Sequence, residues 1–300
     1  MKAIKLKLKS FPLKIFLITL LVITSIWLII DLTIPKIPIF GFHSIVDTQG
    51  LAGKNSQQKF RRIDYSKEDF AEILIYLVNH NFWFLSSQEL YDYFISNSRT
   101  IPPEHLGQKP IMLTFDDSYK TFYTNLLPVL ETIANKYNQK VKVVLFINPG
   151  IMAKNESKTS YNINCNQLRE GLEKGFFDIQ SHGQRHEKLT ELNTKDLIDE
   201  LETAQLQLRK CTAGLDPNQT VASHLAYPFG SSNSKVEKFA AKYYKSGYLY
   251  NSRFFWRGWL KNKYQIPRLT VNRQKPPQGL IHIAEKALKI KNERSLKLSP

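Results

Sequence analysis

The feature that most constrains the fold is an apolar run that ends in two adjacent carboxylates. Residues 110–115, PIMLTF, are followed directly by Asp116 and Asp117. A continuous apolar run of this length is typical of a strand buried on both faces of a parallel sheet. Parallel α/β folds place ligands and catalytic groups at the carboxyl ends of their strands. The run therefore predicts a central buried strand with a candidate site at its end.

The two neighbouring aspartates repel each other unless a positive group divides their roles. A divalent cation does this when one carboxylate binds it and the other remains free as a base. Surface turns also use Asp often, so the pair by itself fits an ordinary turn as well.

A second strand-like run ends in two histidines. Residues 176–181, FFDIQS, lead into His182, and His186 follows four positions later. This spacing lets both imidazoles turn to one side of a tight turn or of a first helical turn. Two imidazoles and one carboxylate leave an open coordination position, as in a catalytic zinc site. Taken alone, the two histidines also fit a solvated loop.

A third strand-like run ends in residues 226–230, AYPFG. The segments 114–117 (TFDD), 181–186 (SHGQRH) and 227–230 (YPFG) resemble, in order and spacing, the first three motifs of the polysaccharide deacetylase family. This family is also known as the NodB homology domain and as carbohydrate esterase family 4. The resemblance covers about residues 37–275 and implies an α/β fold, a distorted (β/α)7 barrel.

The resemblance also implies a role for each matching residue. It implies a divalent metal, foremost Zn2+ but also other divalent transition metals, and Asp116 as general base. The oxyanion would meet the backbone N–H of Phe229, and Tyr227 and His43 would line the substrate groove. The implied metal ligands are Asp117, His182 and His186.

Two positions depart from the family pattern. Ala226 stands where the family often has an arginine that orients the base, and Arg268 is a candidate to supply that charge, although it also fits a surface position. The letters Leu280-Ile281-His282 match the family's last motif, whose histidine is the general acid. However, the surrounding residues 276–287 predict a helix rather than a strand end.

The remaining elements alternate along the chain, which predicts a mostly parallel sheet. Because all the candidate chemistry lies at strand ends, a barrel is favoured over an open sheet. The strands are expected at 37–43, 82–85, 109–115, 141–147, 176–181, 221–227, 248–250 and 264–271. The helices are expected at 66–78, 87–94, 120–136, 166–174, 193–211, 234–245 and 276–289.

The N-terminal segment predicts a membrane anchor. Residues 1–14 are basic, and residues 15–30 contain no charge. Sixteen apolar residues approach the length of a transmembrane helix, and no small-residue cleavage site is evident, so a signal anchor is favoured over a cleaved signal peptide. The lysines in front place segment 1–14 in the cytoplasm. Residues 31–36 would form a linker, and the domain 37–300 would be extracytoplasmic.

The charge composition limits the classes of partner that this chain is expected to bind. The formal charge is +16, from 42 basic and 26 acidic residues. Without a nucleic-acid-binding motif, this excess favours a membrane surface or a cell-wall polymer. The two cysteines, Cys165 and Cys211, form either one disulfide in an oxidising compartment or two separate thiols.

These observations predict a membrane-anchored, metal-dependent enzyme that removes N-acetyl groups from an N-acetylhexosamine polysaccharide at the cell envelope. One alternative is a polysaccharide O-acetyl esterase, because an ester's leaving group needs less help from an acid. Another is an inactive glycan-binding relative. The sequence has no Gly-x-Ser-x-Gly nucleophile elbow, which argues against a serine esterase.

Overall fold

The computed structural model describes residues 13–33, 36–48, 61–154, 160–256, 260–287 and 289–290. The chain divides into two units, Met1–Ile34 and Pro35–Pro300. Nearly all of the predicted basic segment 1–14 lies outside the described residues, as do residues 49–60.

In the described residues of the first unit, Leu13–Thr33 form the helix α1, of 21 residues. Its described side chains are largely apolar and exposed, among them Leu13 at 69% and Phe16 at 58%. Counting only residues that the structure describes, no helix has both the length and the apolarity to cross a membrane. The predicted anchor at 15–30 lies within α1 and stays a prediction.

The second unit is built on one parallel sheet, as the sequence predicts. Its strands follow the order β10-β9-β8-β7-β6-β2-β12, and β5 also pairs with β6, at Lys109–Ile111. Every pairing in this sheet is parallel. The strands are β2 (Ile39–Phe42), β5 (Phe82–Phe84), β6 (Lys109–Asp116), β7 (Val143–Ile147), β8 (Phe177–Ser181), β9 (His224–Ala226), β10 (Ser246–Tyr248) and β12 (Leu269–Thr270).

The sheet curls into a parallel half-barrel. An isolated parallel bridge joins Tyr248, the last residue of β10, to Ile266, which lies just before β12. Two small strand pairs lie beside the main sheet. These are β1 (Lys36–Ile37) with β11 (Phe255–Trp256), which are antiparallel, and β3 (Ile45–Val46) with β4 (Tyr65–Ser66), which are parallel.

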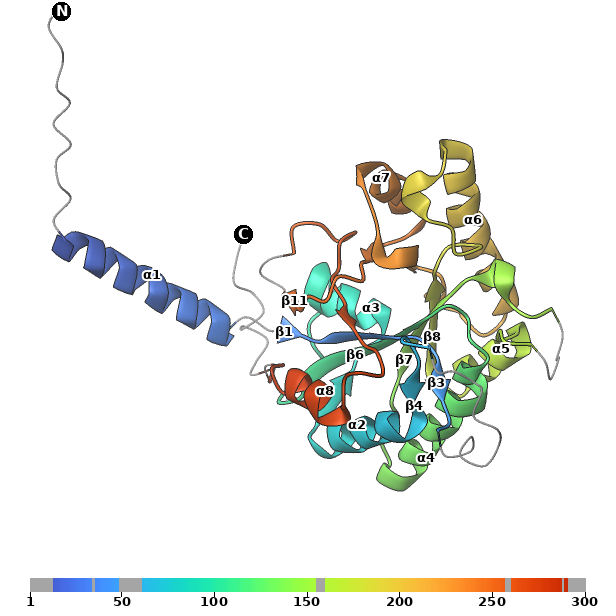
Figure 1. Cartoon of the computed structure of the whole chain (residues 1–300), viewed down its shortest axis with the longest axis horizontal. Helices are drawn as coiled ribbons and strands as arrows, with labels where there is room; N and C mark the ends of the chain where they lie inside the picture. The colour runs from blue at the N-terminus through green and yellow to red at the C-terminus, as the bar shows by residue number, and fades with distance from the viewer. Residues whose placement is uncertain are drawn as a thin grey trace, which may run out of the picture. The chain divides into compact units, whose positions relative to one another are not determined.

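Helices alternate with the strands, and α2, α4, α5 and α6 lie outside β6, β7 and β8 (Figure 1). Side-chain caps set several starts: Ser66 caps α2, and Asn193 caps α6 at the predicted position. The predicted helices at 87–94 and 120–136 each contain a π-helical turn, Tyr91–Ile95 and Phe122–Leu126. The helices are α2 (Lys67–Asn79), α3 (Ser87–Leu90), α4 (Leu127–Tyr137), α5 (Cys165–Glu173), α6 (Thr194–Cys211), α7 (Ser234–Tyr243) and α8 (Pro277–Ala284).

The central strand β6 separates two apolar clusters. Ile111, Leu113 and Phe115 belong to the cluster packed against the helices, whereas Met112 belongs to the cluster enclosed by the sheet. Because side chains alternate along a strand, Thr114 and Asp116 share the enclosed face with Met112. The sheet therefore directs Asp116 inward, while Asp117 lies just beyond the end of the strand.

A disulfide joins Cys165, the first residue of α5, to Cys211, the last residue of α6. Of the two states that the sequence left open, the structure has the bonded one. Its Cα atoms are 5.7 Å apart, and it closes a sequence separation of 46 residues.

Candidate active site

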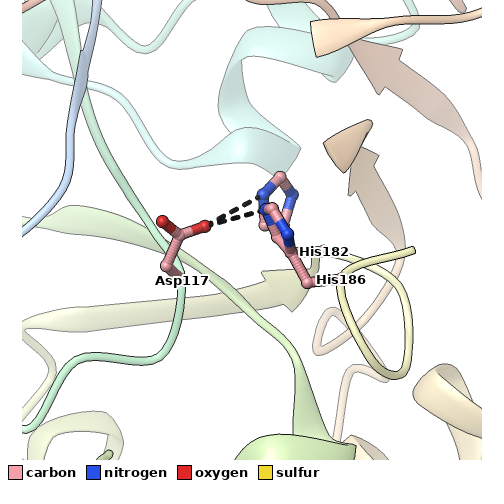
Figure 2. A group of neighbouring side chains, drawn as sticks. All are labelled: Asp117, His182 and His186. Carbon is pink, nitrogen blue, oxygen red and sulfur yellow. Dashed lines mark ion pairs between the residues drawn. The ribbon is translucent and has the colours of Figure 1, made fainter. Parts of the chain in front are cut away.

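Three potential metal ligands meet at the carboxyl ends of β6 and β8. The Oδ1 atom of Asp117 lies 3.4 Å from Nε2 of His182 and 3.2 Å from Nε2 of His186. Figure 2 shows both imidazole rings turned toward this one carboxylate oxygen. One ligand atom from each residue fits within 4.8 Å, and among the described residues this is the one group of its kind.

The backbone around these ligands is strained. Asp117, Ser118, His186 and Phe229 have positive φ angles of 79°, 58°, 63° and 59°. Left-handed backbone is uncommon for residues other than glycine and concentrates at functional sites. The tight turns that follow β6, β8 and β9 use this conformation to bring their side chains together.

The tautomer of His182 suits a metal ligand. Its Nδ1 donates to the carbonyl oxygen of Ala226 at 2.8 Å, so its Nε2 is left to face Asp117. The Oδ1 of Asp117 lies within 3.4 Å of the Nε2 atoms of both His182 and His186. A backbone carbonyl that orients a histidine ring in this way is typical of metal sites. The donor set, one carboxylate and two imidazoles, therefore fits a divalent cation.

The ligands also shift one another's pKa values. Burial alone would raise the pKa of Asp117, but His182 and His186 lower it below its ordinary value. Hydrogen bonding to Asp117 in turn raises the pKa of His186, although partial burial opposes this. Asp117 is therefore ionised at neutral pH, as a metal ligand must be.

The second aspartate, Asp116, is held by Arg268. The guanidinium donates from Nη1 to Oδ1 at 2.7 Å and from Nη2 to Oδ2 at 2.8 Å, and both side chains are almost fully buried. Burial alone would raise the pKa of Asp116, but the charges of Arg268 and then His182 lower it below its ordinary value. Asp116 is thus a fixed, ionised carboxylate next to the ligand group, 3.9 Å from Nε2 of His182.

Further hydrogen bonds and two aromatic rings hold the Arg268 guanidinium in place. Its Nη1 also donates to Oγ1 of Thr114 at 3.0 Å, and its Nε donates to the carbonyl of Leu249 at 2.9 Å. Its guanidinium lies 5.0 Å from the ring of Phe146 and 5.2 Å from that of Tyr250. The segment before β12 therefore delivers a charge that Ala226, on β9, does not supply. The sequence proposed Arg268 for this position, and its role in orienting a base stays a prediction.

Phe229 and His43 lie at the rim of the ligand group. The ring of Phe229 is 4.7 Å from the ring of His186, and its side chain is 65% exposed. The Nε2 of His43 is 3.8 Å from Oδ2 of Asp117. Burial lowers the pKa of His43 below its ordinary value, although Asp116 opposes the shift. Its buried Nδ1 has no hydrogen-bond partner among the described residues.

Two sequence-predicted residues lie away from the site. Tyr227 is fully buried in an apolar cluster beneath it, and its hydroxyl donates to the carbonyl of Tyr264 at 3.0 Å. The expectation that its side chain lines the substrate groove is therefore corrected. The tyrosine packs inward because the chain turns sharply only after it, at Pro228–Gly230.

The second is His282, expected as the general acid. It is exposed on α8, and Glu285, one turn further on, pairs with Lys109 at the start of β6. The strand from Lys109 to Asp116 spans about 23 Å, so His282 is far from Asp116. The letters of the motif fall on a helix rather than on a strand end, and the structure contradicts this expectation.

The structure adds residues that sequence reasoning missed. The hydroxyl of Tyr119 donates to Oδ2 of Asp117 at 3.3 Å, and Nη1 of Arg61 donates to that hydroxyl at 2.9 Å. Tyr250 packs edge-on against His43, with ring centroids 5.4 Å apart. Because Tyr119 lies only two residues after Asp117, its presence at the site could have been predicted from the sequence. Arg61 and Tyr250 come from distant loops, and no sequence pattern places them at the site.

A family model described as polysaccharide deacetylase matches residues 104–246, a range that contains Asp116, Asp117, both histidines and Phe229. Residues 104–246 belong to the polysaccharide deacetylase family. No curated protein sequence matches the chain.

Solved structures show the same fold. A polysaccharide deacetylase from Bacillus cereus is 19% identical and superposes with a TM-score of 0.66, covering 83% of this chain and 69% of that one. Streptococcus pyogenes deacetylase PplD, in complex with acetate, is 23% identical with a TM-score of 0.65, covering 83% and 98%. IcaB from Ammonifex degensii is 15% identical with a TM-score of 0.62, covering 84% and 97%. At these identities the likeness concerns the fold alone.

Proposed function

We propose that this deacetylase-family hydrolase removes N-acetyl groups from a polysaccharide that contains N-acetylhexosamine. The observation that carries the proposal is the pairing of Asp117, His182 and His186 with a separate carboxylate, Asp116, held by Arg268. The Streptococcus pyogenes deacetylase of the same fold is described in complex with acetate, the expected product here. We also propose that the curled parallel sheet and its helices form a distorted (β/α)7 barrel.

Each proposed catalytic role falls on a different set of residues. A divalent cation, foremost Zn2+, would be held by Asp117, His182 and His186 and would supply Lewis-acid activation of water and of the acyl carbonyl. Asp116 takes the proton of the attacking water, and Arg268 keeps this carboxylate ionised and aimed. The backbone N–H of Phe229, at a turn beside His186, donates to the oxyanion. Water attacks directly, so no residue forms a covalent intermediate.

We propose that His43, in its protonated form, supplies the proton for the leaving amine; because burial lowers its pKa, this form is favoured towards acidic pH. The chain has seven histidines, and His182 and His186 are the proposed ligands. Of the others, only His43 lies at the ligand group. The remaining four lie elsewhere: His80 stacks on Tyr76, His105 stacks on Trp83, His224 is buried with Ser246, and His282 is exposed on α8.

A second candidate is a polysaccharide O-acetyl esterase. The observation that favours it is the position of His282, because the family's expected acid is missing from the site. An ester's alkoxide leaves with less help from an acid than an amine does. Two substrates discriminate between the candidates. One is an N-acetylglucosamine oligomer, and the other is a glucosamine oligomer of the same length that carries acetyl groups on oxygen only. Acetate release is measured from each. Faster release from the N-acetyl substrate supports the proposal, whereas release from the O-acetyl substrate alone contradicts it.

The place of action is also proposed. Segment 15–30 would anchor the chain in a membrane, with residues 1–14 cytoplasmic and the domain 37–300 at the cell envelope. The Cys165–Cys211 disulfide supports an exported domain, because disulfides persist in oxidising compartments. When protease is added to cells that lack their outer layers but keep an intact cytoplasmic membrane, it should digest the domain, because the domain lies outside that membrane. Protection of the domain in such cells, with digestion only after lysis, would contradict this placement.

A further inference from the structure

The turn between the two histidine ligands, residues 182–186, has no regular secondary structure to hold it. Gly183 and His186 have left-handed backbone, with φ angles of 74° and 63°. For a residue other than glycine this conformation is costly, and it persists only where the surrounding structure enforces it. Contacts from outside the turn must therefore keep the second histidine in place.

Glu200, on α6, holds the centre of this turn. Its Oε2 accepts hydrogen bonds from the backbone N–H groups of Gln184 at 2.9 Å and of Arg185 at 3.0 Å. Its Oε1 lies 2.9 Å from Nη2 of Arg185, and the glutamate is fully buried. Gly183 lets the carboxylate approach this closely, because a Cβ there would lie 3.1 Å from Oε2. A glutamate is rarely buried completely unless it is paired, and here two of its partners are peptide groups between the histidines.

Asn148, the residue after β7, holds the beginning of the same turn. Its Nδ2 donates to the carbonyl oxygens of His182 and of Gly183, the latter at 3.2 Å. Its backbone N–H donates to Oγ of Ser118 at 2.8 Å, and Ser118 directly follows Asp117 in the chain. Asn148 is fully buried as well. It therefore ties the histidine turn to the turn that carries the third ligand.

Other peptide groups of the turn are paired with the chain around the end of β7. The N–H of His182 donates to the carbonyl of Ile147 at 2.9 Å, and the carbonyl of Gln184 accepts from the N–H of Gly150 at 2.8 Å. Backbone groups that lose their partner inside a protein favour a change of conformation. Loss of the Glu200 carboxylate would remove the acceptor of two neighbouring N–H groups at once, just before the second ligand.

We infer that Glu200 and Asn148 are positioning residues for the metal site, because together they fix the turn that places both histidine ligands opposite Asp117. Neither side chain belongs to the ligand group itself, and each acts through the backbone that it holds. Removal of groups that orient metal ligands typically weakens metal binding 10- to 100-fold. The inference rests on the proposed function, since it assigns a task to residues behind the proposed ligands.

The experiment measures metal binding by the full chain. Native metal is removed, the affinity for Co2+ is determined by chelator competition, and the absorption spectrum of the bound Co2+ reports its coordination. Glu200→Met keeps the length of the side chain but removes the carboxylate, whereas Glu200→Gln keeps an oxygen that can accept both N–H groups. Gln205→Met is the matched control. Gln205 is buried on the same helix, but its Nε2 donates to the carbonyls of Ala222 and Tyr243 rather than to the histidine turn.

Glu200→Met should weaken Co2+ binding roughly 10- to 100-fold and change the spectrum. Glu200→Gln should bind Co2+ nearly as tightly as the wild type and with the wild-type spectrum. Gln205→Met should lower the free energy of unfolding but leave the Co2+ affinity and the spectrum unchanged. Wild-type affinity in Glu200→Met, or an equal loss of affinity in Gln205→Met, would overturn the inference.

A second variant covers the case in which Glu200→Met does not fold. Asn148→Ala removes the donor to the first two carbonyls of the turn and should weaken Co2+ binding roughly tenfold. Wild-type affinity in this variant would likewise overturn the inference.

The two proposals can fail separately. If the variants lose Co2+ affinity as expected but the metal-loaded wild type releases no acetate, the positioning role stands and the deacetylase proposal falls. If the wild type releases acetate while Glu200→Met and Asn148→Ala bind Co2+ as tightly as the wild type does, the deacetylase proposal stands and the positioning role falls.

Discussion

Arg268 binds both carboxylate oxygens of Asp116, at 2.7 and 2.8 Å, across 152 positions of sequence. The pair joins the segment before β12 to the last residue of β6, inside the curled sheet. Such two-pronged contacts fix direction as well as charge. The pair thus links the fold of the C-terminal third to the orientation of the proposed base.

The first prediction concerns this pair. Arg268→Gln should lower kcat for acetate release by roughly 10²–10³-fold, because Asp116 loses its fixed orientation. It should also lower the free energy of unfolding by about 3–5 kcal/mol, since a buried charge is left without its partner. Kinetics and denaturant unfolding measure the two effects.

Two further variants separate orientation from stability. Arg268→Gln combined with Asp116→Asn should recover much of the lost stability but none of the activity, because no buried charge remains. Arg99→Gln, which changes an exposed arginine 3.8 Å from Asp92, is the control and should have little effect. Wild-type kcat in Arg268→Gln would contradict the orienting role.

The second prediction compares two histidines. His43→Gln should lower kcat for the N-acetyl substrate by roughly 10²-fold, because the leaving amine loses its proton donor. His282→Gln should leave kcat within roughly twofold, as expected for an exposed residue on a distant helix. The reverse result, an active His43→Gln and an inactive His282→Gln, would restore the sequence-based assignment.

These histidines show what the sequence could and could not predict. The ligand group and Asp116 were predictable because each follows directly on an apolar strand, and parallel strands end at one edge of the sheet. The assignment of His282 as the general acid failed because a match of three residues does not determine whether they lie at a strand end or on a helix. The residues around it, PPQGLIHIA, form the helix α8 that packs on α2.

The third prediction concerns pH. Hydrogen bonding to Asp117 raises the pKa of His186 in the metal-free protein. A protonated imidazole does not bind metal, so metal affinity should increase as the pH rises from about 6 to about 8. Chelator competition at each pH measures this. An affinity that stays flat over this range would show that His186 is not a ligand.

The same shift affects the stability of the metal-free protein with opposite sign. A raised pKa in the folded state means that protonated His186 stabilises the fold below its unfolded pKa of about 6.5. This contribution disappears as the pH rises through the folded pKa. Melting curves after chelation should show it in the wild type, and it should be absent in His186→Gln.

The fourth prediction concerns the disulfide. Cys165 and Cys211 close a loop with a sequence separation of 46, so reduction should destabilise the domain by up to about 4 kcal/mol in the chain-entropy model. Unfolding with and without a reducing agent measures this. The double variant Cys165→Ser with Cys211→Ser is the control, and it should respond to the reductant no further. An unchanged stability on reduction would show that the bond does not form.

Long-range partners explain what else the sequence missed. Whether the cysteines pair depends on the start of α5 lying beside the end of α6, which neither helix pattern reveals. Arg61 reaches Tyr119 from a loop 58 positions earlier, and Tyr250 meets His43 from the loop after β10. Each of these contacts depends on the path of a loop, which follows from the packed structure and not from local periodicity.

The proposed metal-dependent deacetylase activity is tested most directly with the purified chain and Asp117→Ala side by side. Bound metal is determined by elemental analysis, and acetate release is followed with an N-acetylglucosamine oligomer. We expect one divalent ion per wild-type chain, with both the ion and acetate release lost in the variant. A wild-type chain that binds no metal, or an Asp117→Ala variant that still releases acetate at the wild-type rate, would contradict it.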